Sequence, residues 1–410
     1  MEGTQDSALG EVGLLMYQSG AADDPHTAYR RIREECPVGR AGTGDWASVY
    51  ISRYEDVLWA LRHPEVFSSA SEAFSIGQEQ PLIPLQMDPP EHTWYRRLLN
   101  PEFVPRKVGE LEPDVRNHVN SLIDRFASRG SCDFHEEFAT PLPSAIFLRL
   151  FGLPIEDLPT FLRWRDDLIR PKVDPGDFET AAAIREATSK AINEYFVLSI
   201  ADRRKERGDG LLGQLVHADF DGRVLTDREL LGICQLMLLG GLDTVTATLD
   251  CMIVYLARHP DRRRQLVENP ELIAPAVEEL LRHQTPVTVV PRVLAQDVTI
   301  AGVELHKGER VTLAIGAANT DEAEFEQPED AVLGRDPNRH VAFGGGHHLC
   351  LGAHLARLQL SVSLQELHRR IPDYDIAPGA EVHFSPGIRQ ADQLPLVFPP
   401  ERPKAGRPPG

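Results

Sequence analysis

The sequence lacks several features that would place it in a familiar class of protein. Five cysteines among 410 residues stand at wide, irregular spacing, so no disulfide framework is indicated and a reducing compartment is expected. The only apolar run near the N-terminus, VGLLM at 12–16, is too short to span a bilayer and has neither a basic flank nor a cleavage signal. We therefore predict a cytoplasmic protein without membrane insertion.

Positive charge is also scarce. The chain has 43 lysines and arginines against 62 aspartates and glutamates, which gives a formal net charge of −19. This excess of negative charge disfavours broad binding to nucleic acid or to an anionic membrane. The chain also has no GxGxxG fingerprint and no four-cysteine cluster spacing, so it carries no recognisable flavin or iron–sulfur domain.

What is present is mostly helical patterning. Apolar residues recur at helical spacing through most of the chain, and neither a repeat nor a linker divides it. We predict one mainly α domain with a small β portion over 21–398. A flexible segment over 1–20 and a disordered, Pro/Gly-rich tail over 399–410 should flank this domain.

The predicted β portion lies in the C-terminal third. The runs DVTIAGVEL and ERVTLAIGA alternate apolar and polar residues on either side of the turn His306-Lys307-Gly308. This pattern predicts a β-hairpin across that turn. A further short set of strands is expected in the last 30 residues or so before the tail.

One segment predicts a long helix through the interior. Thr226 and Glu229 form a capping-box pattern, and no proline follows until Pro260, so a helix of about 30 residues, roughly 50 Å long, is expected. Its centre, GGLDT at 240–244, places two glycines, an acid and an alcohol in an apolar stretch. Glycines inside a helix and polar groups in an apolar stretch both cost stability. One explanation is a packing notch in which Thr244 bonds back to the carbonyl of Gly240.

The stretch FGGGHHLCLG, residues 343–352, concentrates glycine, histidine and cysteine. A phosphate loop would need a Gly-Lys-Ser/Thr step, which is absent, and a zinc site would need a second pair of ligands. A glycine turn with an inert buried cysteine is the plain alternative. However, an amphipathic helix follows Cys350, and a helix N-terminus stabilises a thiolate, while glycines let a flat, bulky ligand approach the backbone. A thiolate held in this way suits haem iron.

Four positions of this stretch carry a specific resemblance. Phe343, Gly346, Cys350 and Gly352 match the FxxGxxxCxG signature of the cytochrome P-450 haem-thiolate monooxygenases. Three further motifs follow the order and spacing of that family, and together they cover about residues 25 to 398. The sequence resembles a soluble bacterial member, and its GGLDTV and GHHLCLG segments are most similar to the camphor-hydroxylase class.

The resemblance implies a single-domain P-450 fold, with haem b held between the long central helix and the cysteine-loop helix. Cys350 would be the iron ligand, in a loop that also includes the cofactor-binding residues Phe343, Gly344 and Gly352. Gly240 and Gly241 would open a groove for dioxygen. Asp243 and Thr244 would then relay protons to the distal oxygen so that the O–O bond breaks.

Two other motifs gain a meaning from the resemblance. Glu279 and Arg282 of EELLR stand at i, i+3, which alone is compatible with a solvated surface pair. The resemblance implies instead a buried ion network with Arg335. In DPPEHTWYRR, His92 and Arg96 stand at i, i+4, either as a basic surface stripe or, as the resemblance implies, on the haem propionates. The same role is implied for Arg292 and His348.

The substrate should be a hydrophobic small molecule such as a terpenoid, steroid, fatty acid or polyketide. Segments 68–86, 166–179, 285–290 and 385–388 should cover, close and line its pocket. Apolar residues at these places are about as often core as pocket lining. The candidate contacts are Phe74, Ile76, Leu82, Ile83, Leu239, Val287, Val289 and Ile388.

The resemblance further implies hydroxylation or epoxidation with dioxygen as co-substrate. Two electrons would come from NAD(P)H through a ferredoxin reductase and an acidic ferredoxin. The ferredoxin would dock on a basic patch formed by Arg97, Arg339 and Arg357. The alternatives are a peroxide-driven reaction, which the Asp243–Thr244 pair disfavours, and an oxidative coupling or rearrangement on the same haem.

Overall fold

A computed structural model describes residues 15, 20–42, 47–75, 77–174 and 177–401 of the chain. The flexible segment predicted over 1–20 and the tail predicted over 399–410 lie almost entirely outside the described residues. The described end of that tail is held against the body. The N–H of Glu401 donates to the carbonyl of Ala127 at 2.8 Å, and the Glu401 carboxylate accepts from the guanidinium of Arg370. The ordered body therefore reaches at least Glu401.

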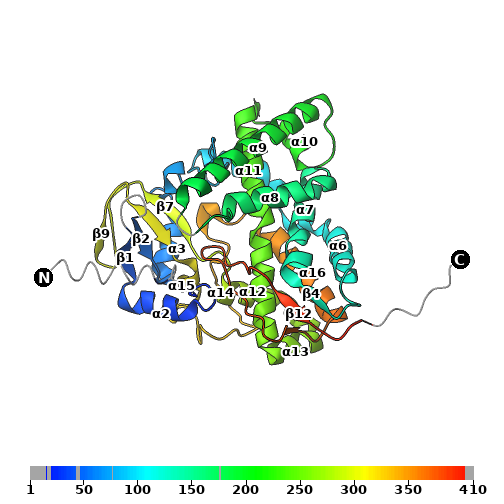
Figure 1. The fold of residues 1–410 in the computed structure, drawn as a ribbon. Coiled ribbons are helices and arrows are strands. Elements are labelled where there is room, and N and C mark those ends of the chain that lie inside the picture. Colours follow the sequence, from blue (N-terminus) through cyan, green and yellow to red (C-terminus); the bar gives the residue numbers. More distant parts are fainter. Residues whose placement is uncertain (1–14, 16–19, 43–46, 76, 175–176, 402–410) are drawn as a thin grey trace.

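Helices make up most of the molecule, as predicted, and fill the side away from the main sheet (Figure 1). The segments predicted from helical spacing are helices in the structure, with ends that differ by a few residues. The longer helices are α2 (His26–Glu35), α3 (Tyr54–Arg62), α4 (Glu91–Leu99), α6 (Glu112–Asp124), α7 (Pro141–Phe151), α8 (Leu158–Ile169), α9 (Phe178–Lys205), α11 (Asp227–Leu242), α12 (Thr244–Arg258), α13 (Pro260–Glu268), α14 (Ile273–Gln284) and α16 (Ala353–Arg370). The shorter ones are α5 (Pro105–Gly109), α10 (Leu211–Val216) and α15 (Ile315–Asn319).

The main sheet lies beside α2 and α3 at one side of the molecule (Figure 1). It has five strands in the order β1-β2-β10-β7-β3. A smaller sheet has the order β11-β12-β4, so the strands expected near the C-terminus form, but they need a partner from residues 131–133. The strands are β1 (Val38–Ala41), β2 (Ser48–Ile51), β3 (Phe67–Ser68), β4 (Ser131–Asp133), β5 (Asp219–Phe220), β6 (Arg223–Val224), β7 (Val290–Leu294), β8 (Val298–Ile300), β9 (Val303–Leu305), β10 (Arg310–Leu313), β11 (Asp375–Ile376) and β12 (Pro395–Val397).

The hairpin predicted across His306-Lys307-Gly308 is wrong. The observed hairpin joins β8 to β9 through Ala301 and Gly302, whose φ angles of 47° and 80° give the compact turn that matches the twist of paired strands. The second run, β10, pairs instead with β7 on one side and with β2 on the other. The partners of β10 are therefore β7 and the distant β2, and not the neighbouring run β9 that the sequence pattern predicted.

The predicted central helix is present but interrupted. Its capping box forms as expected, with the Thr226 hydroxyl accepting from the N–H of Glu229 and the Glu229 carboxylate accepting from the N–H of Thr226. At Asp243 the backbone has φ −110° and ψ −43°, which ends α11 and begins α12 within the GGLDT stretch. The two helices follow one another through the middle of the molecule (Figure 1).

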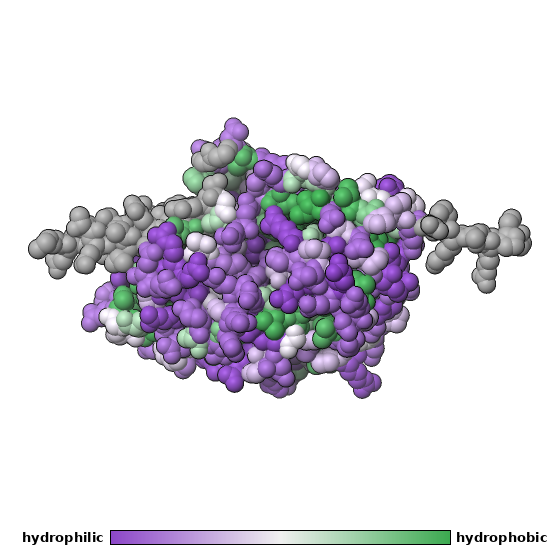
Figure 2. Space-filling view, turned by 90° about the horizontal axis from the view of Figure 1, so that it is seen from below, coloured by the Kyte–Doolittle hydropathy of each residue, from purple (hydrophilic) through white to green (hydrophobic). Residues whose placement is uncertain are grey.

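The pair α11 and α12 is also the one stretch of the described residues that is long and apolar enough to cross a membrane by length and composition. In its most apolar window, 61% of the residues are buried inside the protein, so this stretch serves as a core helix. The face of the molecule in Figure 2 is mostly hydrophilic, with apolar side chains in a few separate groups. Such a surface accords with the net charge of −19.

Candidate functional site

The cysteine loop has the geometry that its sequence predicts. The N–H of Cys350 donates to the carbonyl of Phe343 at 2.9 Å, which closes the loop just before α16 begins at Ala353. Gly344 and Gly346 have φ angles of 72° and 62°, in the region that favours glycine. A Cβ at Gly346 would also lie 2.4 Å from the carbonyl oxygen of Leu61, so only glycine fits this position beside α3.

Cys350 differs from the other cysteines. It is exposed, whereas Cys36, Cys132, Cys234 and Cys251 are buried, so the inert buried cysteine considered from the sequence is wrong. Although the residue is exposed, the protein around its sulfur keeps water away and so raises the pKa of the thiol. The N–H of Gly352 and the positive charges of Arg96 and Arg357 lower this pKa, but by less. A metal cation at the sulfur would remove the proton outright.

Basic side chains from three segments form a cluster beside this loop, which we call the cationic cluster after its two arginines. His92 and Arg96 come from α4, Arg292 from β7 and His348 from the loop itself. The rings of His92 and His348 lie 4.2 Å apart between centroids, and Arg96 donates to the carbonyl of Leu349 at 2.7 Å. The charges of Arg292 and Arg96 both act on the ring of His348, so the structure brings together all four side chains that were predicted to contact the propionates.

This cationic cluster has little negative charge to balance it. Both ring nitrogens of His92 and Nε2 of His348 are buried without a hydrogen-bond partner among the described residues. Burial and nearby cations lower the pKa of His92 to about 4 and that of His348 to about 2. Burial also lowers the pKa of Arg292 to about 10, and only the charge of Asp88 acts against it. The arginines are the cations of this cluster, and the neutral imidazoles add unpartnered ring nitrogens. Together they fit an anionic ligand with several acceptor oxygens, such as a pair of carboxylates.

The predicted ion network is present, and its central pair, Glu279 and Arg282, is fully buried. Glu279 accepts two hydrogen bonds of 2.8 Å from Arg282, and neither side chain is exposed to solvent. Arg335 adds bonds of 3.1 and 3.0 Å to the same carboxylate, and Arg282 also donates to backbone carbonyls. Burial alone would raise the pKa of Glu279, but these partners hold it below its usual range. The surface-pair alternative for EELLR is therefore wrong.

The interruption between α11 and α12 combines an open position with a tight one. A Cβ at Gly240 would meet nothing within 4 Å, whereas a Cβ at Gly241 would lie 2.9 Å from the ring of Phe147. The hydroxyl of Thr244 donates to the carbonyl of Gly240 at 3.1 Å, so the hydrogen bond of the packing-notch explanation forms. Gly241 therefore serves packing, and Gly240 leaves room beside the helix.

Asp243 has a partner that the sequence analysis missed. Its carboxylate is fully buried and accepts two hydrogen bonds from Arg170, one of them 3.3 Å long. Arg170 follows the last residue of α8, inside the segment predicted to close over the pocket. Arg165 lies 4.0 Å from the same carboxylate. A lone arginine in a loop gives no local signal of its partner, and these residues are 73 positions apart.

The candidate substrate contacts divide into two groups. Leu82 and Ile83 are 1% and 3% exposed, and the N–H of Ile83 donates to the carbonyl of Gly232 on α11, so these two side chains belong to the core. The candidate Ile76 lies outside the described residues. Those that keep some exposure, as pocket-lining side chains would, are Phe74, Leu239, Val287, Val289 and Ile388. Val287 and Ile388 face one another across an isolated β-bridge.

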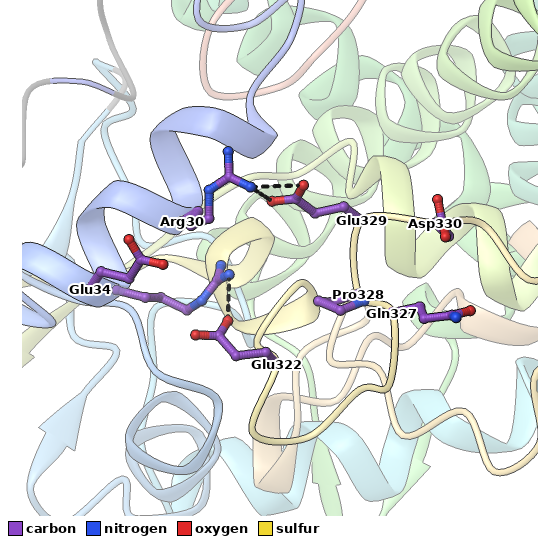
Figure 3. A pocket seen from close by; sticks show the side chains of 8 residues that line it. Arg30, Glu34, Glu322, Gln327, Pro328, Glu329 and Asp330 are labelled. Carbon is purple, nitrogen blue, oxygen red and sulfur yellow. Dashed lines mark hydrogen bonds and ion pairs between the residues drawn. The ribbon is translucent and has the colours of Figure 1, made fainter.

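A surface cavity of about 460 Å³ lies elsewhere, between α2 and the chain that follows α15 (Figure 3). Charged side chains surround it, and Arg30 donates to Glu329 across it at 2.8 and 3.0 Å. Such a lining does not suit a hydrophobic small molecule. This cavity is therefore not the predicted substrate pocket.

The arginines predicted to form a docking patch each have an acidic neighbour. Arg97 lies 3.4 Å from Asp221, Arg339 lies 3.4 Å from Glu324, and Arg357 donates two bonds of 2.7 Å to Glu278. The guanidinium of Arg357 also lies 4.5 Å from the ring centre of Phe343, in the cysteine loop. Arg357 thus supports this loop from behind, and its charge is largely balanced.

Comparisons with known proteins agree with this geometry. The family model described as Cytochrome P450 matches residues 11–275 and 268–370. A steroid C26-monooxygenase of Mycobacterium tuberculosis is 36% identical over 394 residues, covering 93% of this chain and 96% of that protein. The polyketide biosynthesis cytochrome P450 PksS of Bacillus subtilis is 32% identical over 373 residues, covering 86% of this chain and 90% of that protein.

Solved structures give the same result. The crystal structure of CYP109E1 from Bacillus megaterium in complex with testosterone has a TM-score of 0.86 and 29% sequence identity, covering 93% of this chain and 99% of that chain. A likeness of this extent confirms the predicted fold, mainly helical with small sheets. The chain belongs to the cytochrome P450 family, and it is therefore an enzyme of the haem-thiolate, oxygen-using monooxygenase type.

Proposed function

We propose that this chain hydroxylates or epoxidises a hydrophobic small molecule, with Cys350 as the thiolate ligand of haem b. The observation that carries the proposal is the pairing of an exposed cysteine in a glycine loop with a basic cluster whose buried ring nitrogens have no hydrogen-bond partner among the described residues. Haem b would offer one iron ion to the thiolate and two propionates to His92, Arg96, Arg292 and His348. Bound there, the haem supplies the activation of dioxygen.

The residues of the helix interruption are suited to proton transfer. Thr244 carries a hydroxyl next to the open position at Gly240, and Asp243 supplies a carboxylate one residue away. Asp243 ends α11 and is fully buried, and Thr244 begins α12 and is half-buried. We assign Thr244 the direct role and Asp243 the role of the acid behind it. This acid–alcohol pair favours a dioxygen-driven reaction over a peroxide-driven one.

The first test is the absorption spectrum of the reduced protein under carbon monoxide. We expect the Soret band at the position typical of thiolate-ligated haem, and its loss in Cys350→Ala. Cys132→Ala, a change at a buried cysteine on β4, is the matched control and should keep the band. A band typical of a neutral ligand in the wild-type protein would contradict the assignment of Cys350.

A second test addresses the proton relay. Thr244→Ala should keep the haem and the carbon monoxide spectrum but send a larger share of the electrons to hydrogen peroxide. Thr248→Ala is a suitable control, since that hydroxyl donates to the carbonyl of Thr244 at 2.7 Å on the same helix. The measurement is peroxide formed per NAD(P)H consumed. An unchanged ratio in Thr244→Ala would remove the relay assignment.

For the substrate we propose a steroid or polyketide before a fatty acid or terpenoid. Support comes from the half-buried apolar side chains at Phe74, Leu239, Val287, Val289 and Ile388, and from the names of the relatives described above. Titration of the ferric protein with testosterone, a macrolide, myristic acid and camphor should separate these classes. The class that shifts the Soret band of the ferric protein is the one to test for turnover.

For the redox partner we propose an acidic ferredoxin, reduced by an NAD(P)H-dependent reductase in the cytoplasm. The proposed docking site is the face around the cysteine loop, where Arg97 is 60% exposed and Arg339 is 68% exposed. Charge reversal at these two arginines should slow reduction by the ferredoxin, most clearly at low salt. Arg204→Glu, an exposed change on α9, is the control. An unchanged reduction rate would rule out this placement.

A further inference from the structure

The carboxylate of Asp243 stands at one end of a buried polar chain that crosses four segments of the fold. Arg170 binds Asp243 and also donates to the side-chain oxygen of Gln390. The amide nitrogen of Gln390 lies 3.3 Å from Nε2 of His135, and Nδ1 of His135 lies 2.8 Å from the carboxylate of Asp250. Asp243 and Asp250 are fully buried, while Gln390 and His135 are 3% and 6% exposed.

The chemistry of these groups fixes the direction of every hydrogen bond. Arginine has only donors, so the Gln390 atom that faces Arg170 must be the amide oxygen. The amide NH₂ of Gln390 then faces His135, and Nε2 of His135 must accept. The ring proton is therefore on Nδ1, from which it is donated to Asp250.

We propose that Gln390 and His135 are positioning residues for Asp243, which hold Arg170 against its carboxylate only while Nε2 of His135 carries no proton. This inference rests on the proposed function, because Asp243 matters as the acid behind Thr244. It extends that function by making the acid depend on a buried histidine on the far side of Gln390. Gln390 also fixes the neighbouring loop, since its main-chain carbonyl accepts from the N–H of Ser385, near Ile388.

Protonation of Nε2 of His135 would reverse the direction of the hydrogen bonds that Gln390 makes. An N–H on Nε2 would point at the NH₂ of Gln390, so the amide would turn over to present its oxygen to the ring. Its NH₂ would then face the donors of Arg170, and Arg170 would lose one of its acceptors. The hydroxyl of Thr140, 3.4 Å from Nε2, is the other group that the ring can use.

The charges around His135 set where this change takes place. Asp250 faces it from α12, Glu136 from its own turn and Arg165 from α8. Burial alone would lower the pKa of His135, but the hydrogen bond and the charge of Asp250 outweigh it and raise the pKa. The hydrogen bonds therefore keep these directions only at a pH above the raised pKa of His135, which is higher than the ordinary pKa of histidine. As the pH falls through that raised pKa, the arrangement is disrupted.

Nitrogen-15 NMR of histidine-labelled, reduced, carbon-monoxide-bound protein tests the tautomer directly. We expect the neutral form of His135 to carry its proton on Nδ1, and Gln390→Leu to shift the Nε2 resonance because the donor to that atom is removed. A neutral His135 with its proton on Nε2 overturns the proposal. This measurement requires no substrate and reports the wild-type protein even where a variant does not fold.

The infrared stretching band of the bound carbon monoxide tests the link to the site. The band should shift with pH in step with the titration of His135, and the shift should be absent in His135→Gln. His368→Gln, at a buried histidine on α16, is the matched control and should keep the wild-type shift. A band independent of pH through that titration, or an unchanged shift in His135→Gln, overturns the proposal. If the wild-type protein binds no carbon monoxide, the proposed function fails, and the nitrogen spectrum of the reduced protein still decides the tautomer.

Discussion

Two buried groups of charges lie close to the cysteine loop, and they differ in one respect. Around Glu279 every charge has a partner, because Arg282, Arg335 and backbone groups share a single carboxylate. Around His92 two arginines have only the charge of Asp88 near them, and buried ring nitrogens make no hydrogen bond among the described residues. A complete network indicates a structural role, whereas an incomplete one indicates a ligand that brings the missing charge.

The largest effect should come from removing the centre of the complete network. Glu279→Ala leaves Arg282 and Arg335 buried beside no carboxylate, which should cost about 3–5 kcal/mol of unfolding free energy, with or without haem. Urea unfolding measures the loss. Glu35→Ala, which breaks an exposed pair with Arg31, is the control and should stay close to wild type. A small loss in Glu279→Ala would mean that the network is not structural.

Removing a charge from the cationic cluster should weaken haem binding without lowering the stability of the haem-free protein. Arg292→Met removes a 7% exposed cation, so the haem-free protein should be as stable as wild type or more stable. Haem should be held less tightly by about 1.5–3 kcal/mol, the usual worth of a charged hydrogen bond, or roughly 10–100-fold. Transfer of haem to a haem-free globin measures this. Equal destabilisation of both forms would remove the distinction between the two groups.

A smaller effect is expected from Glu278, in the pH dependence of the free energy of unfolding. Burial raises the pKa of Glu278, but Arg357 and His340 outweigh it and lower the pKa to about 2. A depressed pKa contributes stability above the unfolded value of about 4.3, and this contribution is lost as the pH falls toward the folded value. Allowing for its partial exposure, we expect about 1–2 kcal/mol to disappear between about pH 5 and 2.

Glu278→Gln should flatten the curve of unfolding free energy against pH in that range. Glu194→Gln, on the exposed face of α9, should leave the curve unchanged. A curve for Glu278→Gln that parallels the wild-type curve would show that the ion pairs of Glu278 with Arg357 and His340 give no net stabilisation. This test would compare the stabilisation from Glu279, at the centre of the ion network, with that from Glu278, whose partner Arg357 lies against Phe343 of the cysteine loop.

Features with a local signature were predictable from the sequence. The capping box at Thr226 and the helical spacing of α2 or α16 depend on neighbours within one or two turns, and the structure follows them closely. The cysteine loop was predictable for the same reason, since its glycines at 344 and 346 are required by the loop's own backbone. Regular spacing identifies a segment because the chemistry that forms it lies within that segment.

Features that depend on distant partners were not predictable. The strand β10 was assigned to a neighbouring run, but it lies between β7 and β2, and the latter is over 250 residues away. The docking arginines were counted as positive charge, but each has a carboxylate nearby in the fold. A partner brought near by tertiary packing leaves no regular spacing in the sequence, so the composition alone could not show that these arginines have acidic neighbours.

The sequence by itself indicated the family, the cysteine loop, and the residues that meet in the ion network and the cationic cluster. Only the tertiary structure decided the partner of Asp243, because Arg170 is 73 positions away and belongs to no recognisable motif. Motifs record groups whose spacing along the chain is constrained by one local shape. The neighbours of a buried carboxylate are instead set by which segments the core packs against it, and that is a property of the whole fold.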